Sequence, residues 1–298
     1  DVIQSQSAGP KILVVGDVML DIYTTGSADR VSPESPVLVV KTQSLEVRLG
    51  GAANVAANCA ALGATVSILG LVGADSQGAT VKRLMQEQAI QDRLVVDAGR
   101  PTTSKERILS YAANRTLQQV LRLDRELNIP AFDEAEEALA QTLEHALADA
   151  QVVLVSDYGK GVCTARLLAE LISKSQTRGI PVLVDPAAGS DWEQYRGASL
   201  IKPNRREAEA VSGSRVLCVA DAAAVAQKAA ATYAISQVVI TLDHEGMLLY
   251  QEPGLVQALP SVPRQVADVT GAGDTVLAVL GVAMALGSSV KEAAHLAN

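Results

Sequence analysis

The sequence predicts an α/β protein in which helices flank a doubly wound, mainly parallel sheet, with a small β-sheet lid beside it. From residue 133 onward, apolar strands alternate with helices, the strands at 152–155 and 181–184 and the helices at 134–148 and 164–178. Strands that are apolar along their whole length are typical of a parallel sheet, because helices cover both of its faces. Polar residues follow these strands, at the sheet edge where such folds bind ligands.

The first predicted strand, residues 11–15, ends at Gly16-Asp17, and Asp21 follows one helical turn later. Acidic residues at the end of a first strand are candidates for ligand binding, although a turn with a helix cap explains them equally well. Two more strands are expected at 37–41 and 44–49. They precede any crossover helix, so we expect them to leave the main sheet and form the separate lid layer.

A helix rich in small residues is predicted next, beginning at Gly50-Gly51 and running to Leu62, where Gly63 ends it. Small side chains permit a close approach, either to a neighbouring element or to a bound polyol. Asn54 lies beside the two glycines and is a candidate ligand contact, because a polar amide on an apolar helix needs a partner.

Charged residues mark the next part of the chain, after a core strand at 66–71 and an amphipathic helix at 77–89. Strands are predicted at 107–111 and 117–123. Two pairs of residues share strand faces: Lys105 with Arg107, and Arg122 with Asp124. Two interpretations stay open, a solvated edge strand that avoids pairing through its charges and a group of side chains that converge on a phosphate of the substrate.

The alternation continues in the last third of the chain. A short strand ends at Pro203, and Asn204 with Glu207 three residues later matches either a helix capping box or a ligand site. Further on, the sequence predicts a helix at 221–234, strands at 238–241 and 247–250, and a turn at 243–246 between these strands.

The stretch Asp268-Val269-Thr270-Gly271-Ala272-Gly273-Asp274-Thr275 connects the end of a strand to an apolar helical run at 276–286. Two glycines at such a turn let the backbone amides point at one spot, and the helix adds its positive end, which together make an anion site. A carboxylate there repels an anion, so Asp274 suggests a base that takes a proton from an attacking hydroxyl. An aspartate that only caps the helix is the alternative.

Composition narrows the class of protein. A net charge of −8 over 298 residues argues against a nucleic-acid partner or an acidic membrane surface. The three cysteines, Cys59, Cys163 and Cys218, are scattered without metal-like spacing and are typical of reduced core thiols. The first ten residues carry no apolar signal segment, and the longest apolar run is too short to span a bilayer. We therefore expect a soluble, cytoplasmic protein.

Common nucleotide fingerprints are absent from the sequence, since it has neither a GxxxxGK[ST] loop nor a GxGxxG after the first strand. Three other motifs occur in order: Gly50-Gly51-x-x-Asn54, Asn204-x-x-Glu207 and Asp268-x-x-Gly271-Ala272-Gly273-Asp274. With them the chain resembles the ribokinase-like (PfkB) family of carbohydrate kinases over essentially its whole length. The resemblance implies one kinase domain over residues 1–298, lid strands inserted at about 22–48 and 100–126, and a family fold whose C-terminal end is missing after residue 298.

The family resemblance also implies roles for individual residues. Asp274 would be the catalytic base, and the amides of Gly271, Ala272 and Gly273 would bind the transferred phosphoryl group. The implied cofactors are ATP and Mg²⁺, with Glu207 holding Mg²⁺ through water, and a monovalent cation near Asp268 and Thr270. The remaining implied nucleotide-binding residues are Asn204, Thr241, Asp243 and Gly246, and the sugar-binding residues are Asp17, Asp21, Gly50, Gly51 and Asn54.

Several stretches, including Ser32-Pro33-Glu34-Ser35-Pro36 and Ser156-Asp157-Tyr158-Gly159-Lys160-Gly161, most resemble the branch of the family that phosphorylates D-glycero-D-manno-heptose 7-phosphate on its anomeric hydroxyl, on the way to ADP-heptose and the lipopolysaccharide core. Such a substrate already carries a phosphate. The implied contacts to that phosphate are Arg48, Lys105, Arg107, Arg122 and Lys160, with Asp124 beside them. A kinase for ribose, fructose or a nucleoside, and a non-catalytic sugar-phosphate sensor, are the alternatives.

Two departures from the family pattern stand out. Ala187 follows Asp185-Pro186, where such kinases often have a lysine, and the chain stops at Asn298, before a helix and a glycine-containing segment that normally adjoin the adenine. The resemblance therefore predicts an altered contact at residue 187 and an incomplete nucleotide pocket. A homodimer that pairs lid edges such as 37–41 is also expected.

Overall fold

A computed structural model of the chain describes residues 9–111, 117–261 and 271–298. Its main sheet runs in the order β15-β14-β13-β12-β11-β10-β1-β4-β6, parallel from β13 to β6, with β14 and β15 added antiparallel at one edge. The strands are β1 (Lys11–Gly16), β4 (Thr65–Leu69), β6 (Gln91–Asp92), β10 (Val152–Ser156), β11 (Val182–Asp185), β12 (Leu200–Ile201), β13 (Gln237–Thr241), β14 (Met247–Gln251) and β15 (Leu255–Leu259).

Helices cover both faces of this sheet, as alternate residues of β1 show. Leu13 and Val15 belong to a core cluster that includes side chains of α3, α4, α5 and α6, whereas Ile12 and Val14 belong to a second cluster with α1, α2, α7 and α8. The helices are α1 (Ala52–Ala61), α2 (Ser76–Glu87), α3 (Asp133–Leu147), α4 (Ala165–Arg178), α5 (Arg205–Ser212), α6 (Val219–Tyr233), α7 (Ala272–Ala285) and α8 (Val290–Ala297). The predicted fold class is confirmed.

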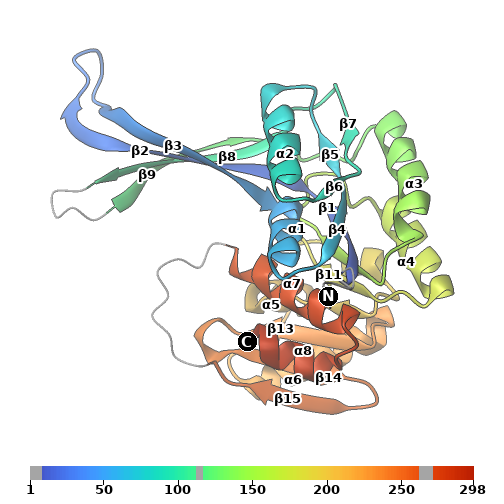
Figure 1. The fold of residues 1–298 in the computed structure, drawn as a ribbon. Coiled ribbons are helices and arrows are strands. Elements are labelled where there is room, and N and C mark those ends of the chain that lie inside the picture. Colours follow the sequence, from blue (N-terminus) through green and yellow to red (C-terminus); the bar gives the residue numbers. More distant parts are fainter. Residues whose placement is uncertain (1–8, 112–116, 262–270) are drawn as a thin grey trace, which may run out of the picture.

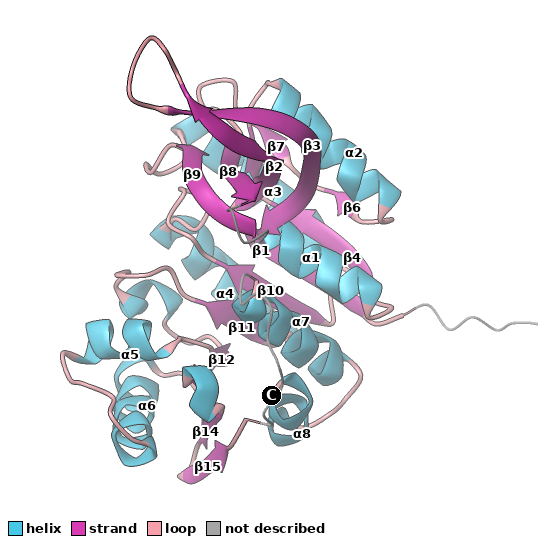
Figure 2. Ribbon diagram, turned by 90° about the vertical axis from the view of Figure 1, so that its left-hand side faces the viewer, coloured by secondary structure: helices cyan, strands magenta, loops and turns pink. Residues whose placement is uncertain are grey.

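A second sheet of four strands, in the order β3-β2-β8-β9, projects away from the helices and the main sheet (Figure 1). We call it the second sheet; its strands are β2 (Val18–Val31), β3 (Leu38–Gly51), β8 (Thr103–Tyr111) and β9 (Leu117–Arg125). β2 is antiparallel to β3 and parallel to β8, and β8 is antiparallel to β9. In Figure 2 its long strands curve over the end of the main sheet. A further pair, β5 (Leu71–Val72) and β7 (Val95–Val96), lies outside both sheets.

The second sheet has one charged face and one mostly apolar face, on which Glu106 accepts a hydrogen bond from Thr24 at 2.7 Å. Residues that pair across the strands point to the same side. One row pairs Arg48 with Asp21, Asp21 with Lys105, and Lys105 with Asp124; the next pairs Glu46, Tyr23, Arg107 and Arg122 in the same way. On the opposite side, Leu45, Thr24, Ile108 and Leu121 form a row.

The expected helical turn between Asp17 and Asp21 is wrong. Residues 18–31 form the extended strand β2, because Ile22, Tyr23, Thr24 and Thr25 favour a strand and both neighbours, β3 and β8, bond to it. The predicted strands at 37–41 and 44–49 are one continuous strand, β3, with an irregularity near Gly26 in its partner. Within the described ranges, no helix combines the length and the apolar character that a membrane crossing requires.

Candidate active site

Asp274 lies in the first turn of α7, which begins after Gly271, and only 4% of it is exposed. Its carboxylate accepts two hydrogen bonds of 2.7 Å, one at Oδ2 from the Asn54 side-chain amide and one at Oδ1 from the Tyr158 hydroxyl. Asn54 is on α1 and Tyr158 follows β10, so three separate segments meet at this carboxylate. The structure thereby brings the predicted base and the predicted sugar ligand Asn54 together.

Opposing influences act on the Asp274 carboxyl. Burial raises its pKa, the hydrogen bonds from Asn54 and Tyr158 lower it, the charge of Asp185 raises it and Lys202 lowers it; the net pKa is above the usual value for aspartate. Burial of the Tyr158 hydroxyl and the nearby Asp274 charge raise the pKa of Tyr158 as well. The phenol therefore stays protonated at neutral pH and acts as the donor to Asp274.

The two glycines of the motif keep the start of α7 free of side chains. Gly271 has a φ of +76°, and a Cβ there would lie 2.9 Å from the Asn54 amide nitrogen. A Cβ on Gly273 would lie 3.5 Å from Lys202 Nζ and 3.6 Å from Asp185 Oδ2. A helix N-terminus with this little side-chain bulk and a lysine nearby suits a phosphoryl group.

A buried ion pair adjoins this turn. Lys202, 2% exposed at the end of β12, contacts Asp185 at the end of β11 with 2.9 Å between Nζ and Oδ1. Burial raises the pKa of Asp185 in spite of the lysine. Burial also raises the pKa of Glu207, and the charge of Asp185 raises it further. The charged side chains of Asp185 and Lys202, at the carboxyl ends of β11 and β12, therefore lie beside the start of α7.

Glu207 and Asn204 form the capping box that begins α5. Asn204 Oδ1 accepts from the Glu207 amide at 3.0 Å, and Glu207 Oε2 accepts from the Asn204 amide at 2.8 Å. In the described part of the chain no three His, Cys, Asp or Glu side chains form a metal-binding group by themselves. Mg²⁺ usually takes one or two carboxylates together with waters and substrate phosphates. The neighbouring carboxyls of Asp185 and Glu207 fit that donor set.

The other predicted nucleotide residues lie close together in sequence and space. Thr241 bridges to Asn204, which places the end of β13 beside the start of α5. Asp243 pairs with Arg205 at 3.1 Å, so its carboxylate is already engaged. Gly246 has a φ of +100°, and a Cβ there would lie 2.1 Å from the Leu259 carbonyl oxygen, so only glycine fits. Their binding of a nucleotide stays a prediction, and Asp268 and Thr270 fall outside the described residues.

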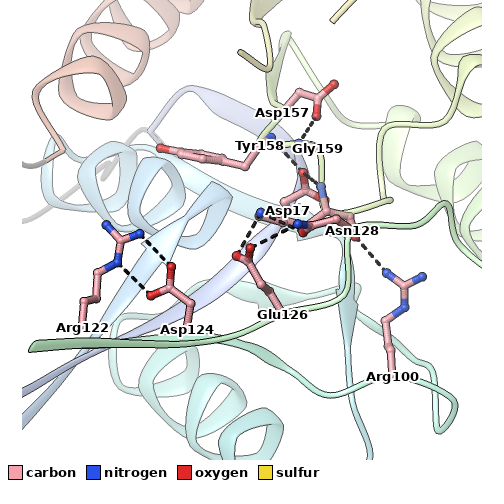
Figure 3. Close-up of polar contacts among 10 residues, drawn as sticks. Asp17, Arg100, Arg122, Asp124, Glu126, Asn128, Asp157, Tyr158 and Gly159 are labelled. Carbon is pink, nitrogen blue, oxygen red and sulfur yellow. Dashed lines mark hydrogen bonds and ion pairs between the residues drawn. The ribbon is translucent and has the colours of Figure 1, made fainter. Parts of the chain in front are cut away.

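Asp17 is buried beneath the loop that follows β10, which we call the β10 loop (residues 157–162). Its carboxylate accepts a hydrogen bond from the backbone amide of Tyr158 at 2.8 Å (Figure 3), and two more from the amides of Lys160 and Val162 at 3.0 and 3.1 Å. Burial and the charge of Asp17 raise the pKa of Asp157 to about 6. These contacts give Asp17 a structural task, and its binding of the sugar stays a prediction.

Most of the predicted basic residues have acidic partners. Arg107 contacts Asp21 at 2.5 Å, Arg122 contacts Asp124 at 2.8 Å (Figure 3), Arg48 contacts Glu46 at 2.6 Å and Lys160 contacts Glu126 at 2.9 Å. Lys105 differs: across residues 9–111, 117–261 and 271–298 it makes no ion pair, and its Nζ lies 5.5 Å from the Tyr158 ring centroid. Gly50 packs against Asp21, because a Cβ there would lie 2.5 Å from its carboxylate.

Sequence reasoning assigned no individual role to Tyr158, Asp185 or Lys202, although they lie at strand ends where it predicted ligand binding. Asp185 ends the parallel strand β11, and Tyr158 and Lys202 follow β10 and β12, so the rule that ligands bind beyond the carboxyl ends of such strands is the signal that points to them. Ala187 is buried, and its backbone amide donates to the Tyr195 hydroxyl at 3.2 Å. An altered ligand contact at this residue stays a prediction.

The model of the pfkB carbohydrate kinase family matches residues 10–298. The chain belongs to this family. Membership makes it a phosphotransferase with a sugar hydroxyl as acceptor. Curated relatives of this pfkB kinase include the bifunctional protein HldE of Geobacter metallireducens, 44% identical over 96% of this chain and 57% of that protein, and HldE of Shewanella piezotolerans, 42% identical over 97% of this chain and 58% of that protein. The chain thus spans less than two thirds of these relatives.

Solved structures of other pfkB kinases share the fold. Escherichia coli phosphofructokinase-2 in complex with fructose-6-phosphate has a TM-score of 0.77 at 20% identity, covering 97% of this chain and 91% of that one. Arabidopsis thaliana ribokinase with ribose and ATP has a TM-score of 0.74 at 20% identity, covering 97% of this chain and 90% of that one.

Proposed function

We propose that the chain is an ATP-dependent kinase domain that phosphorylates the anomeric hydroxyl of D-glycero-D-manno-heptose 7-phosphate. The observation that carries this proposal is the charged face of the second sheet. Asp21, Arg48, Lys105 and Arg107 share that face, and Lys105 contacts Tyr158, which in turn holds Asp274. A substrate with a phosphate at one end and a reactive hydroxyl at the other suits a charged face on which Lys105 has no acidic partner among the described residues and which adjoins a carboxylate base.

In the proposed reaction Asp274 accepts the proton of the attacking hydroxyl, and the sugar oxygen forms a bond to the γ-phosphorus of ATP as the bond to ADP breaks. The backbone amides at the start of α7 stabilise charge on the transferred group. Lys202 adds a positive charge beside Gly273. When bound, Mg²⁺ would neutralise phosphate charge, and Asp185 and Glu207 are the residues that would hold it, Glu207 through water.

Steady-state kinetics with several acceptors test the proposal. We expect kcat/KM for heptose 7-phosphate to exceed that for free heptose, ribose and fructose by about two orders of magnitude or more, because a site built for a charged group rejects a ligand that lacks it. A free sugar as the best acceptor would favour a pfkB kinase for another sugar. If no acceptor yields ADP while heptose 7-phosphate still binds, the sensor alternative is favoured instead.

We also propose a homodimer that covers the apolar face of the second sheet. Leu45 and Leu121 lie in one row of that face and are 66% and 52% exposed. Every residue of the edge strand β9 is exposed. A second copy of the chain would bury both the leucine row and the edge strand β9. We place the protein, as a dimer, in the cytoplasm.

Leu121→Glu is expected to shift the protein from dimer to monomer in sedimentation velocity, because it places a charge in the proposed contact. Leu286→Glu is the matched control, since Leu286 is 69% exposed at the end of α7, outside the second sheet. A wild-type protein that sediments as a monomer at micromolar concentration contradicts the dimer.

A further inference from the structure

Tyr158 joins the second sheet to the candidate base. Its hydroxyl donates to Asp274 Oδ1 at 2.7 Å, and Lys105 Nζ of β8 lies 5.5 Å from the centroid of its ring. The side chain points away from Asp17, while the backbone of the same residue stays beside it (Figure 3). Tyr158 therefore contacts the buried Asp17 through its backbone, and Asp274 and Lys105 through its side chain.

The backbone of the β10 loop is fixed from several sides. The Asp17 carboxylate binds the amides of residues 158, 160 and 162, and the Gly159 amide donates to Asp157 Oδ1 at 2.8 Å. The Arg100 guanidinium, itself buried, donates to the Lys160 carbonyl at 2.9 Å. Such a network holds the Cα of Tyr158 in place, so the phenol reaches Asp274 from a rigid support rather than from a mobile surface loop.

We infer that Tyr158 is a positioning residue for phosphoryl transfer, which holds the Asp274 carboxylate in one orientation through its hydroxyl. The inference rests on the proposed role of Asp274 as base. A hydrogen bond donated to a carboxylate stabilises the ionised form, and a base acts only in that form. Asn54 supplies a second bond at the other oxygen. Between them the two donors fix the plane of the carboxylate.

The groups that face Asp274 determine its pKa and therefore the expected pH dependence of turnover. They are Asn54 on α1, Tyr158 in the β10 loop, Asp185 at the end of β11 and Lys202 after β12. Burial and Asp185 raise the pKa of Asp274, whereas Asn54, Tyr158 and Lys202 lower it. Removing the phenol hydroxyl removes one lowering influence. The pKa of Asp274 then rises. Because turnover requires the ionised Asp274, the acidic limb of the pH–rate profile moves to higher pH.

The test is Tyr158→Phe, with kcat and kcat/KM measured from pH 5 to 9. We expect kcat to fall about 10-fold and the acidic limb to move upward by about one pH unit, with an unchanged KM for ATP. Tyr195→Phe is the matched control, because Tyr195 is a buried phenol that donates to Asp157 at 2.7 Å. That variant is expected to lower Tm without moving the limb.

The outcomes separate this inference from the proposed function. A folded Tyr158→Phe protein with the wild-type acidic limb overturns the inference, whatever its Tm. If Tyr158→Phe does not fold, replacing the six tyrosines by fluorotyrosine gives the second measurement: the more acidic phenol donates more strongly, so the limb should move to lower pH, and an unmoved limb overturns the inference. Turnover that survives Asp274→Asn overturns the proposed function instead.

Discussion

Asp274→Asn is expected to lower kcat by about 10² to 10⁴, the usual effect of losing a positioned base, while the affinity for ATP stays nearly the same. Asparagine has the same shape, and its amide oxygen can still accept a hydrogen bond from Tyr158 or Asn54, so the site keeps most of its packing. An amide does not take up a proton at neutral pH. Rapid-quench measurement of phosphoryl transfer and calorimetric titration with an ATP analogue separate the two effects.

The matched control for this substitution is Asp221→Asn. Asp221 occupies the same position in the first turn of α6 that Asp274 occupies in α7, and it accepts from the backbone amides of Leu217 and Cys218. If Asp274 only caps a helix, both variants should lose a similar, small part of their stability and keep their activity. Full turnover in Asp274→Asn therefore contradicts its role as base.

The features that the sequence predicted correctly are those with a local cause. The apolar run predicted as a strand at 152–155 forms β10 (Val152–Ser156), in which every residue is buried. The Asn204 and Glu207 spacing produces a capping box because its hydrogen bonds lie within one turn. The motif glycines mark the start of α7 for the same reason. Periodicity and capping act over a few residues, which is the range that a single sequence makes visible.

The features that sequence reasoning missed depend on distant partners. Asn54 and Asp274 are 220 residues apart in the chain, and both belong to recognised motifs, yet only the packing of α1 beside α7 shows that they share a hydrogen bond. Residues 18–31 contain acidic residues and a glycine, and they become a strand because β3 and β8 bond to both edges. Tyr158 has no sequence pattern of its own, since its position depends on the buried Asp17.

The contrast between local causes and distant partners also applies to the basic residues, because their positions in the sequence predict a group but not which member is free to bind a ligand. Alternation along the chain places Lys105, Arg107 and Arg122 on strand faces. That Arg48 lies in one row with Lys105, beside the row of Arg107 and Arg122, depends on pairing among four strands. Once the contacts are known, the residues differ. Arg107 neutralises the half-buried Asp21, so its charge already has a partner within the sheet. Lys105 keeps its charge available for a ligand.

Lys105→Met is accordingly expected to reduce kcat/KM for heptose 7-phosphate by about 10- to 100-fold, the range for a hydrogen bond to a charged group, and to leave kcat/KM for free heptose much less changed. Methionine keeps a stem of similar length, so packing near Tyr158 is largely retained while the charge is lost. Steady-state kinetics with both acceptors measure the change as a ratio, which cancels any general effect on the base.

Lys41→Met is the matched control, since Lys41 is an exposed lysine of β3 and no part of the two charged rows. It should leave both acceptors unaffected. The ratio also decides between two consequences of the Lys105 contact with the Tyr158 ring. If Lys105 mainly supports Tyr158, both acceptors lose activity equally and the acidic limb shifts; if Lys105 binds the substrate phosphate, the loss is confined to the phosphorylated acceptor. An equal loss for both acceptors removes the phosphate-binding assignment, and with it the main reason to prefer a sugar phosphate over a free sugar.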